Sequence, residues 1–196
     1  MTGERQRARL VAEVCHEVGN LLAGARLLTS ECADGEELRI ARSLGRAGAL
    51  VALLPSLAGG GSPRAAGPPA DPLEVLEGLW RGVDVADEAR LRVELRSAVG
   101  LPGAALDADL LHHLLLAQVL VALDEGPGRV SVAASGASGA VCFHVRGLAP
   151  QLAAASLPRD VADALLRPGG GRAEALDGPG EPGVALWVPA AARAPR

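Results

Sequence analysis

The sequence predicts an α+β protein in which an N-terminal antiparallel helical hairpin precedes an α/β sandwich. Apolar residues recur at helical spacing through residues 1–57, Gly and Pro dominate residues 58–72, and helix-like and strand-like patterns alternate through 73–190. We therefore expect a hairpin domain, a linker and a second domain with these bounds, followed by a short tail at 191–196. With 49% apolar residues in a chain of 196, the core can be built, mainly from Leu, Val and Ala because aromatic residues make up only 2%.

The hairpin is predicted from two apolar stripes. Residues 4–31 are expected to form one helix, and one of its faces collects six apolar residues: Val11, Val14, Val18, Leu21, Ala25 and Leu28. A tight break is expected at 32–35, where Asp34 can cap a second helix with Glu37 at capping-box spacing. That helix is expected to end at Leu54, before Pro55. Its stripe consists of Ile40, Leu44, Ala47, Val51 and Leu54.

Both stripes step by three and four residues, a spacing that favours near-parallel helix packing. Two helices alone bury too little surface to be stable. A symmetric homodimer would complete a four-helix bundle, and this is the arrangement we favour. The alternative is a hairpin that packs against its own second domain.

The second domain is predicted to alternate helices with strands. Helices are expected at 73–81, 107–123 and 161–166, and strands at 91–96, 129–134, 140–146 and 183–188. Residues 135–139 are expected to join two of the strands into a hairpin, and Gly169, Gly170 and Gly171 to form a loop. The order indicates an antiparallel or mixed sheet with helices on one face.

Composition excludes several functions. The net charge is −4 and no basic stripe carries interleaved aromatic residues, which argues against nucleic-acid binding. Three dispersed cysteines are too few for a disulfide framework or a zinc cage, and Cys15 and Cys142 are expected to be small core residues. The adjacent His112 and His113 lack the i, i+4 spacing of metal ligands. No signal core is present and no apolar run is expected to span a bilayer, so we expect a cytoplasmic protein without a membrane partner.

The candidate functional residue is His16, which lies on the helix face opposite the apolar stripe. The side chains around it are mostly small or polar: Arg9, Ala12, Glu13, Gly19, Asn20 and Ala23, with Leu27 further along. An imidazole on such a surface suits a group that must meet another macromolecule. Gly19 in a helix interior costs up to about 1 kcal/mol relative to Ala, which close approach of a partner would explain.

The run His16-Glu17-Val18-Gly19-Asn20 resembles the H-box of bacterial histidine kinases, although that family usually has Pro where this chain has Leu21. The preceding Cys15 and the lack of a sensor segment make the chain more similar to the ChpT-type histidine phosphotransferases. This resemblance implies a helical-hairpin dimerisation domain followed by a degenerate histidine-kinase-type ATPase domain.

The boxes that hold nucleotide in the kinases are not matched. The two asparagine positions of the kinase N-box fall on Ala117 and Val121, and neither side chain can ligate a hard cation. The aspartate that binds adenine falls on Arg146, and the second glycine of that box is missing. The loop Gly169-Gly170-Gly171 could mimic the last glycine box, but it is more simply a turn. The resemblance therefore implies a retained fold with no stably bound cofactor.

The resemblance implies that His16 accepts a phosphoryl group from the aspartyl phosphate of a response-regulator receiver domain and passes it to a second receiver. The receiver would supply magnesium. Glu17 would fix the imidazole tautomer and Asn20 would orient the incoming group, although both could be plain solvated residues. The docking face would comprise Arg9, Ala12, Glu13, Gly19 and Ala23. Two alternatives stay open: a non-catalytic dimeric binding module of the same fold, and an atypical ATP-dependent histidine kinase.

Overall fold

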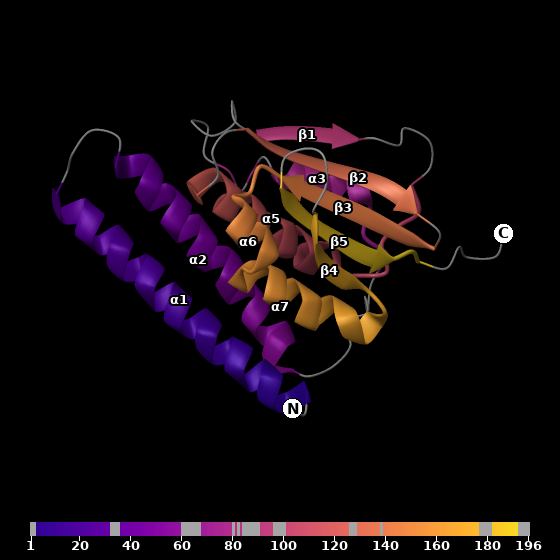
Figure 1. The fold of residues 1–196 in the computed structure, drawn as a ribbon, viewed down its shortest axis with the longest axis horizontal. Coiled ribbons are helices and arrows are strands. Elements are labelled where there is room, and N and C mark those ends of the chain that lie inside the picture. Colours follow the sequence, from indigo (N-terminus) through magenta and orange to yellow (C-terminus); the bar gives the residue numbers. More distant parts are fainter. Residues whose placement is uncertain are drawn as a thin grey trace.

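The computed structural model describes residues 3–31, 36–59, 68–79, 81, 83, 91–95, 101–125, 129–137, 139–176 and 182–191. Helix α1 (Gly3–Glu31) and helix α2 (Glu36–Ala58) form an antiparallel hairpin that lies along one side of a helix-and-sheet body (Figure 1). This arrangement confirms the predicted α+β class. The predicted break at 32–35 lies outside the described residues.

Among the described residues, the second domain contains four α-helices and five strands, and the sequence pattern predicted only part of them. Its elements are α3 (Pro72–Leu79), β1 (Leu91–Leu95), α5 (Ala108–Glu125), β2 (Val130–Ala137), β3 (Ala140–Arg146), α6 (Pro150–Ala154), α7 (Leu157–Leu166), β4 (Arg172–Leu176) and β5 (Gly183–Pro189). The sheet order is β1-β2-β3-β5-β4. Strands β1 and β2 are parallel and the other pairs are antiparallel, so the sheet is mixed.

Several boundaries differ from the prediction. Helix α2 continues through Pro55 to Ala58, because Leu53 and Leu57 on either side of the proline are both buried, and the amide of Gly59 still donates to the Pro55 carbonyl at 2.9 Å. A proline removes one helical donor but does not end a helix that tertiary packing holds.

The connection between β2 and β3 is shorter than predicted. The strands pair up to Ala137 and Ala140, and Gly139 adopts a φ of 74° in the turn. Positive φ is accessible to glycine at little cost, so a tight turn replaces the expected five-residue loop. Helix α7 also begins earlier than predicted, at Leu157, where the Ser156 hydroxyl accepts from the amide of Arg159.

The segment expected to be a linker contributes to packing at its end. Ala70 is buried and exchanges two backbone hydrogen bonds with Ala104, at 3.0 and 2.8 Å. Pro72 is buried at the start of α3, and the Asp71 carboxylate accepts from the amide of Leu73 at 2.8 Å. Packing against the second domain therefore begins before residue 73.

A single apolar core joins the hairpin to the second domain. Leu10 and Val14 of α1 and Leu50 and Leu53 of α2 belong to the same buried cluster as the side chains of α5, α7 and the sheet. Figure 1 shows the corresponding order of layers, from α1 through α2 to α5 and α7 and then the sheet. The hairpin therefore packs against its own second domain, the alternative that the sequence left open. Homodimerisation remains a prediction.

The buried face of α2 is rotated from the predicted stripe. Leu50, Leu53 and Leu57 are at most 1% exposed, whereas Leu44 and Val51 are 48% and 47% exposed. The predicted stripe is therefore only partly buried within the monomer, and Leu44 and Val51 lie on its exposed side. The reason is that α2 is packed against both α1 and α5, and the face between these two neighbours is the one that becomes buried.

Helix α2 also corrects an expectation about membranes. Its segment Arg39–Ala58, with a mean hydropathy of 1.2, is long and apolar enough by composition to cross a membrane, although no apolar run was expected to reach that length. In the structure this segment packs against α1 and α5, and Arg46 within it pairs with acidic side chains of both neighbours.

The buried polar side chain of α5 leads to a stability prediction. Gln118 is 0% exposed, and neither its Nε2 nor its Oε1 has a hydrogen-bond partner among the described residues. Leaving a buried polar group unsatisfied costs about 1–3 kcal/mol, so Gln118→Met, which keeps the length of the side chain, is expected to raise the free energy of unfolding by about that amount. Urea unfolding of both proteins tests this. Destabilisation by the methionine would show that the amide is satisfied in solution.

Candidate functional site

The residues singled out in the sequence share the solvent side of α1. Six of them are exposed: Arg9, Ala12, His16, Gly19, Asn20 and Ala23. Positions 12, 16 and 20, and likewise 16, 19 and 23, are three or four residues apart and therefore neighbour one another on the helix surface. The imidazole of His16 consequently lies among small side chains, with the Asn20 amide one turn further on.

Gly19 leaves this surface open. A Cβ built on Gly19 would meet no atom within 4 Å. The fold of the monomer therefore does not need glycine at this position, so any requirement for it must come from a molecule that approaches the helix from outside.

The two glutamates near His16 are engaged in ion pairs. Glu13 and Arg9 pair along α1 at 2.9 Å, and both side chains are largely exposed. Glu17 turns toward α2, where Arg46 Nη2 donates to its Oε1 at 2.6 Å. The structure thus gives the Glu17 carboxylate a contact with the neighbouring helix that the sequence did not suggest.

Arg46 is the residue near this site that sequence reasoning missed. Its Nη1 also lies 3.7 Å from the Asp124 carboxylate at the end of α5. The sequence did show Arg46 as a charged residue that interrupts the apolar pattern between Gly45 and Ala47. Its two acidic partners, however, are far from it in sequence.

The two cysteines that the structure describes differ in environment. Cys15, next to His16, is exposed, so the expectation of a core residue is wrong for it. Cys142 is buried as expected, and burial raises the pKa of its thiol to about 11. Because the thiolate is the reactive form, this burial disfavours reaction at Cys142.

The positions on which the nucleotide boxes of the kinases fall in this sequence lie in the apolar interior or at strand ends. Ala117 and Val121 are 0% and 1% exposed and belong to the main core cluster. Gly147, after Arg146, has a φ of 98°, and a Cβ there would lie 2.4 Å from the Arg129 carbonyl oxygen, so the chain needs glycine for its turn.

The loop at Gly169, Gly170 and Gly171 is a turn in the structure. Residues Arg167–Gly169 form a short 3-10 helix that closes on Gly170, whose φ is 86°. A Cβ on Gly171 would lie 2.4 Å from the Trp187 carbonyl oxygen of β5. The positive φ of Gly170 and the close packing of Gly171 against the sheet therefore account for these two glycines.

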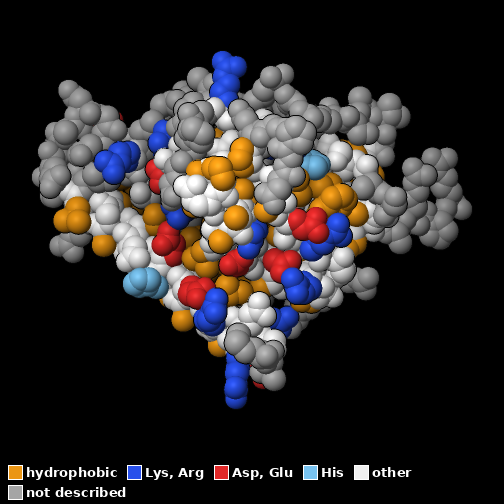
Figure 2. Space-filling model, in the orientation of Figure 1, with side chains coloured by type: hydrophobic (Ala, Val, Ile, Leu, Met, Phe, Trp, Pro, Cys, Tyr) orange, Lys and Arg blue, Asp and Glu red, His pale blue; other side chains and the backbone are white. Residues whose placement is uncertain are grey.

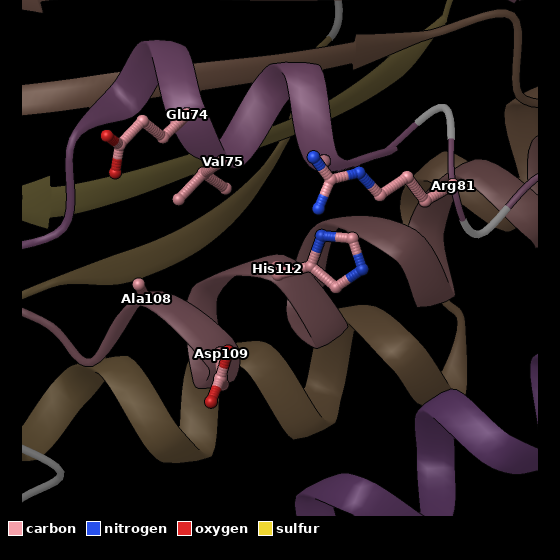
Figure 3. Close-up of a pocket in the computed structure, with 7 residues that line it drawn as sticks. Glu74, Val75, Arg81, Ala108, Asp109 and His112 are labelled. Carbon is pink, nitrogen blue, oxygen red and sulfur yellow. The ribbon is translucent and has the colours of Figure 1, made fainter.

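A cavity of about 270 Å³ lies between α3 and α5, and His16 is not part of its lining. Figure 3 shows the His112 ring and the Arg81 guanidinium facing the space between the two helices, while Asp109 points away from it. Burial, and then the neighbouring His113, lowers the pKa of His112. Within the described part of the chain, no group of three or more His, Cys, Asp or Glu side chains is placed to hold a metal ion.

The surface in Figure 2 mixes acidic and basic side chains, and the two signs alternate over the face that it shows. No large patch of one sign is seen among the described residues on this face.

Comparison with known proteins shows the fold. The chain is similar to the full-length ShkA structure in complex with AMPPNP, at 20% identity and a TM-score of 0.50, covering 98% of this chain and 47% of that one. It is similar to the Acinetobacter baumannii histidine kinase AdeS, at 15% identity and a TM-score of 0.54, covering 89% and 97%. A histidine kinase from Burkholderia phymatum STM815 matches at 14% identity and a TM-score of 0.49.

These similarities establish a histidine-kinase-like fold for the chain. The chain spans about half the length of the ShkA chain that it matches. No family model matches the sequence, and no curated protein matches it.

Proposed function

We propose that this protein is a histidine phosphotransferase of a phosphorelay, which passes a phosphoryl group between response-regulator receiver domains through His16. The observation that carries this proposal is the exposed imidazole among small side chains on the outer face of α1, in a chain with a histidine-kinase-like fold. The proposal places the protein in the cytoplasm, where receivers are found.

The chemistry is a reversible transfer between a carboxylate and an imidazole. A neutral nitrogen of His16 attacks the phosphorus of the receiver's aspartyl phosphate, the bond from phosphorus to the carboxylate oxygen breaks, and the free aspartate leaves. The imidazole gives up its ring proton to solvent or to a nearby base, and the reverse reaction loads a second receiver. Positioning and charge neutralisation provide most of the catalysis, and the receiver's magnesium provides the charge.

The remaining site residues have supporting roles in this proposal. Asn20 orients the incoming phosphoryl group, and Glu17 holds the His16 segment. The receiver docks on the surface formed by Arg9, Ala12, Glu13, Gly19 and Ala23. The open space at Gly19 favours such a role because nothing within the monomer fills it.

Transfer without ATP is supported by the residues at the two asparagine positions of the kinase N-box. Ala117 and Val121 have no oxygen donors for magnesium and are enclosed in the core, so a nucleotide would have to open that core to reach them. At the adenine-binding position, Arg146 provides a cation where the kinases have an acceptor.

The experiment that tests this function is phosphoryl transfer from a panel of phosphorylated receiver domains to the purified protein, beside a reaction with ATP alone. Label from a receiver and none from ATP is the expected result. Label from ATP alone would establish the atypical kinase, and no label from any receiver would favour the non-catalytic binding module.

The exposed apolar residues of the hairpin support a homodimer. Of the large apolar side chains that the structure describes as exposed, Leu22, Leu27, Leu44 and Val51 lie on the hairpin, and only Leu73 lies elsewhere. Leu44 and Val51 are seven residues apart, so they lie on one face of α2, as in a helix that packs against another.

Charging this face is expected to separate the protomers. The double variant Leu44→Glu/Val51→Glu should weaken the dimer at least ~100-fold, because burying an unpaired carboxylate is costly, and light scattering after gel filtration should then report the mass of a monomer. Leu73→Glu, on α3, is the matched control and should leave the mass unchanged. A wild-type protein that is monomeric at high concentration would contradict the homodimer.

A further inference from the structure

Arg46 connects three helices beside the candidate site. From α2 it donates to Glu17 of α1 at 2.6 Å, and it lies 3.7 Å from Asp124 of α5. Glu17 immediately follows His16, and Asp124 belongs to the second domain. One guanidinium thus links the segment that bears His16 to the body of the second domain.

The environment of Arg46 makes this link stronger than an ordinary surface ion pair. Its side chain is only 12% exposed, against 26% for Glu17 and 32% for Asp124. Partly buried charges are screened less by salt than exposed ones, and hydrogen bonds between charged groups are stronger than those between neutral groups. By contrast, the Arg9–Glu13 pair on α1 has 65% and 43% exposed side chains.

On the buried face of α1, the side chains that follow Glu17 are less deeply packed than Val14 before them and Ala25 after them. Leu10 and Val14 are 3% and 0% exposed, whereas Val18 and Leu21, on the same face further on, are only partly buried. The pair of Glu17 with Arg46 lies beside these partly buried positions and joins α1 to α2 there.

We propose that Arg46 is a positioning residue through which the second domain holds the His16 segment of α1 in place for phosphoryl transfer. This inference rests on the proposed function and assigns the second domain a part in it. Asp124 orients the Arg46 guanidinium, which in turn fixes Glu17 and thereby the direction in which the outer face of α1 presents His16. Phosphoryl transfer is sensitive to such placement because it depends chiefly on alignment.

The first test measures amide hydrogen exchange in the full chain and does not depend on activity. Asp124→Asn should raise the exchange rate of the α1 amides around His16 by about threefold or more, because local opening follows the loss of restraining contacts. Glu174→Gln removes a carboxylate of another arginine pair, in β4, and is the matched control that should leave α1 unchanged. Unchanged exchange in Asp124→Asn would overturn the proposal.

The same measurement in a protein that already lacks Arg46 tests whether Arg46 is the link between Asp124 and α1. In Arg46→Met the Asp124→Asn substitution should have no further effect on α1, since the guanidinium that joins them is gone. If Arg46→Met fails to fold, Arg46→Lys serves instead, because a lysine keeps the charge but cannot present two nitrogens to two carboxylates. An effect of Asp124→Asn that persists in this background would overturn the assignment to Arg46.

The second test measures transfer from a phosphorylated receiver in a single turnover. Asp124→Asn should lower the maximal transfer rate by about threefold or more, because misplacement of the nucleophile slows transfer. The receiver concentration at half-saturation should stay unchanged, since Asp124 is not on the docking face. Equal maximal rates in wild type and variant would overturn the positioning role. Failure of the wild type to accept label would instead overturn the proposed function, while the exchange measurement still decides the link.

Discussion

Replacing His16 by glutamine is expected to abolish phosphoryl acceptance from receiver domains. Glutamine keeps a polar side chain of similar reach but has no nucleophilic nitrogen, so the loss should be at least ~1000-fold in transfer rate. The side chain is exposed on α1, so the substitution should not disturb the core. Transfer of label from a phosphorylated receiver, followed over time for both proteins, measures the difference.

Two controls make this result specific to His16. His113→Gln is the matched substitution on α5, where the ring nitrogen lies 2.7 Å from the Asp109 carbonyl oxygen, and it should leave transfer unchanged. The label on the wild type should be labile in acid and stable in base, as expected of a phosphorus–nitrogen bond. Label that survives in His16→Gln would place the acceptor elsewhere and contradict the proposed site.

In the His16→Gln variant, the loss of phosphoryl transfer can be measured separately from the binding of a receiver. Because His16 is exposed, His16→Gln leaves the shape of the outer α1 face nearly intact. The variant should therefore still compete with the wild type for a receiver. A different outcome would identify the non-catalytic binding module. In that outcome no receiver transfers label to the wild type, yet a receiver binds His16→Gln as tightly as it binds the wild type.

The parts of the fold that could be predicted are those with a strong local period. The long helix α1, the apolar helix α5 and the alternating strand β1 were all predicted close to their observed bounds. The missed elements are short and depend on their neighbours. Strand β4 is a strand of five partly or fully exposed residues that lies at the edge of the described sheet beside β5, and helix α6 has five residues without a side-chain cap.

The candidate site was predictable to the same extent. The period of α1 correctly put His16 on the solvent side, because a single helix determines that property. The role of Arg46 could not be deduced, since its partners Glu17 and Asp124 meet it only after three helices have packed. The rotation of α2 was missed for the same reason: a stripe of apolar residues does not reveal which of two neighbours will cover it.

The shared core makes the hairpin and the second domain one cooperative unit, which a substitution in α2 can test. Leu53 is 0% exposed and belongs to the buried cluster that runs from α1 to the sheet. Leu53→Ala should lower the free energy of unfolding by about 2–5 kcal/mol, the usual cost of removing a buried leucine side chain. Leu73→Ala, at a leucine that is 42% exposed, should change it by less than about 1 kcal/mol.

Two optical probes decide whether Leu53→Ala destabilises the hairpin and the second domain together. Circular dichroism is dominated by the helices, including α1 and α2, while tryptophan fluorescence reports the second domain because both tryptophans follow residue 72. If the core is continuous, Leu53→Ala should shift both urea transitions together, since a two-state unit unfolds as a whole. Independent unfolding of the hairpin at lower urea would show that the two domains are held together too weakly for the second domain to position His16.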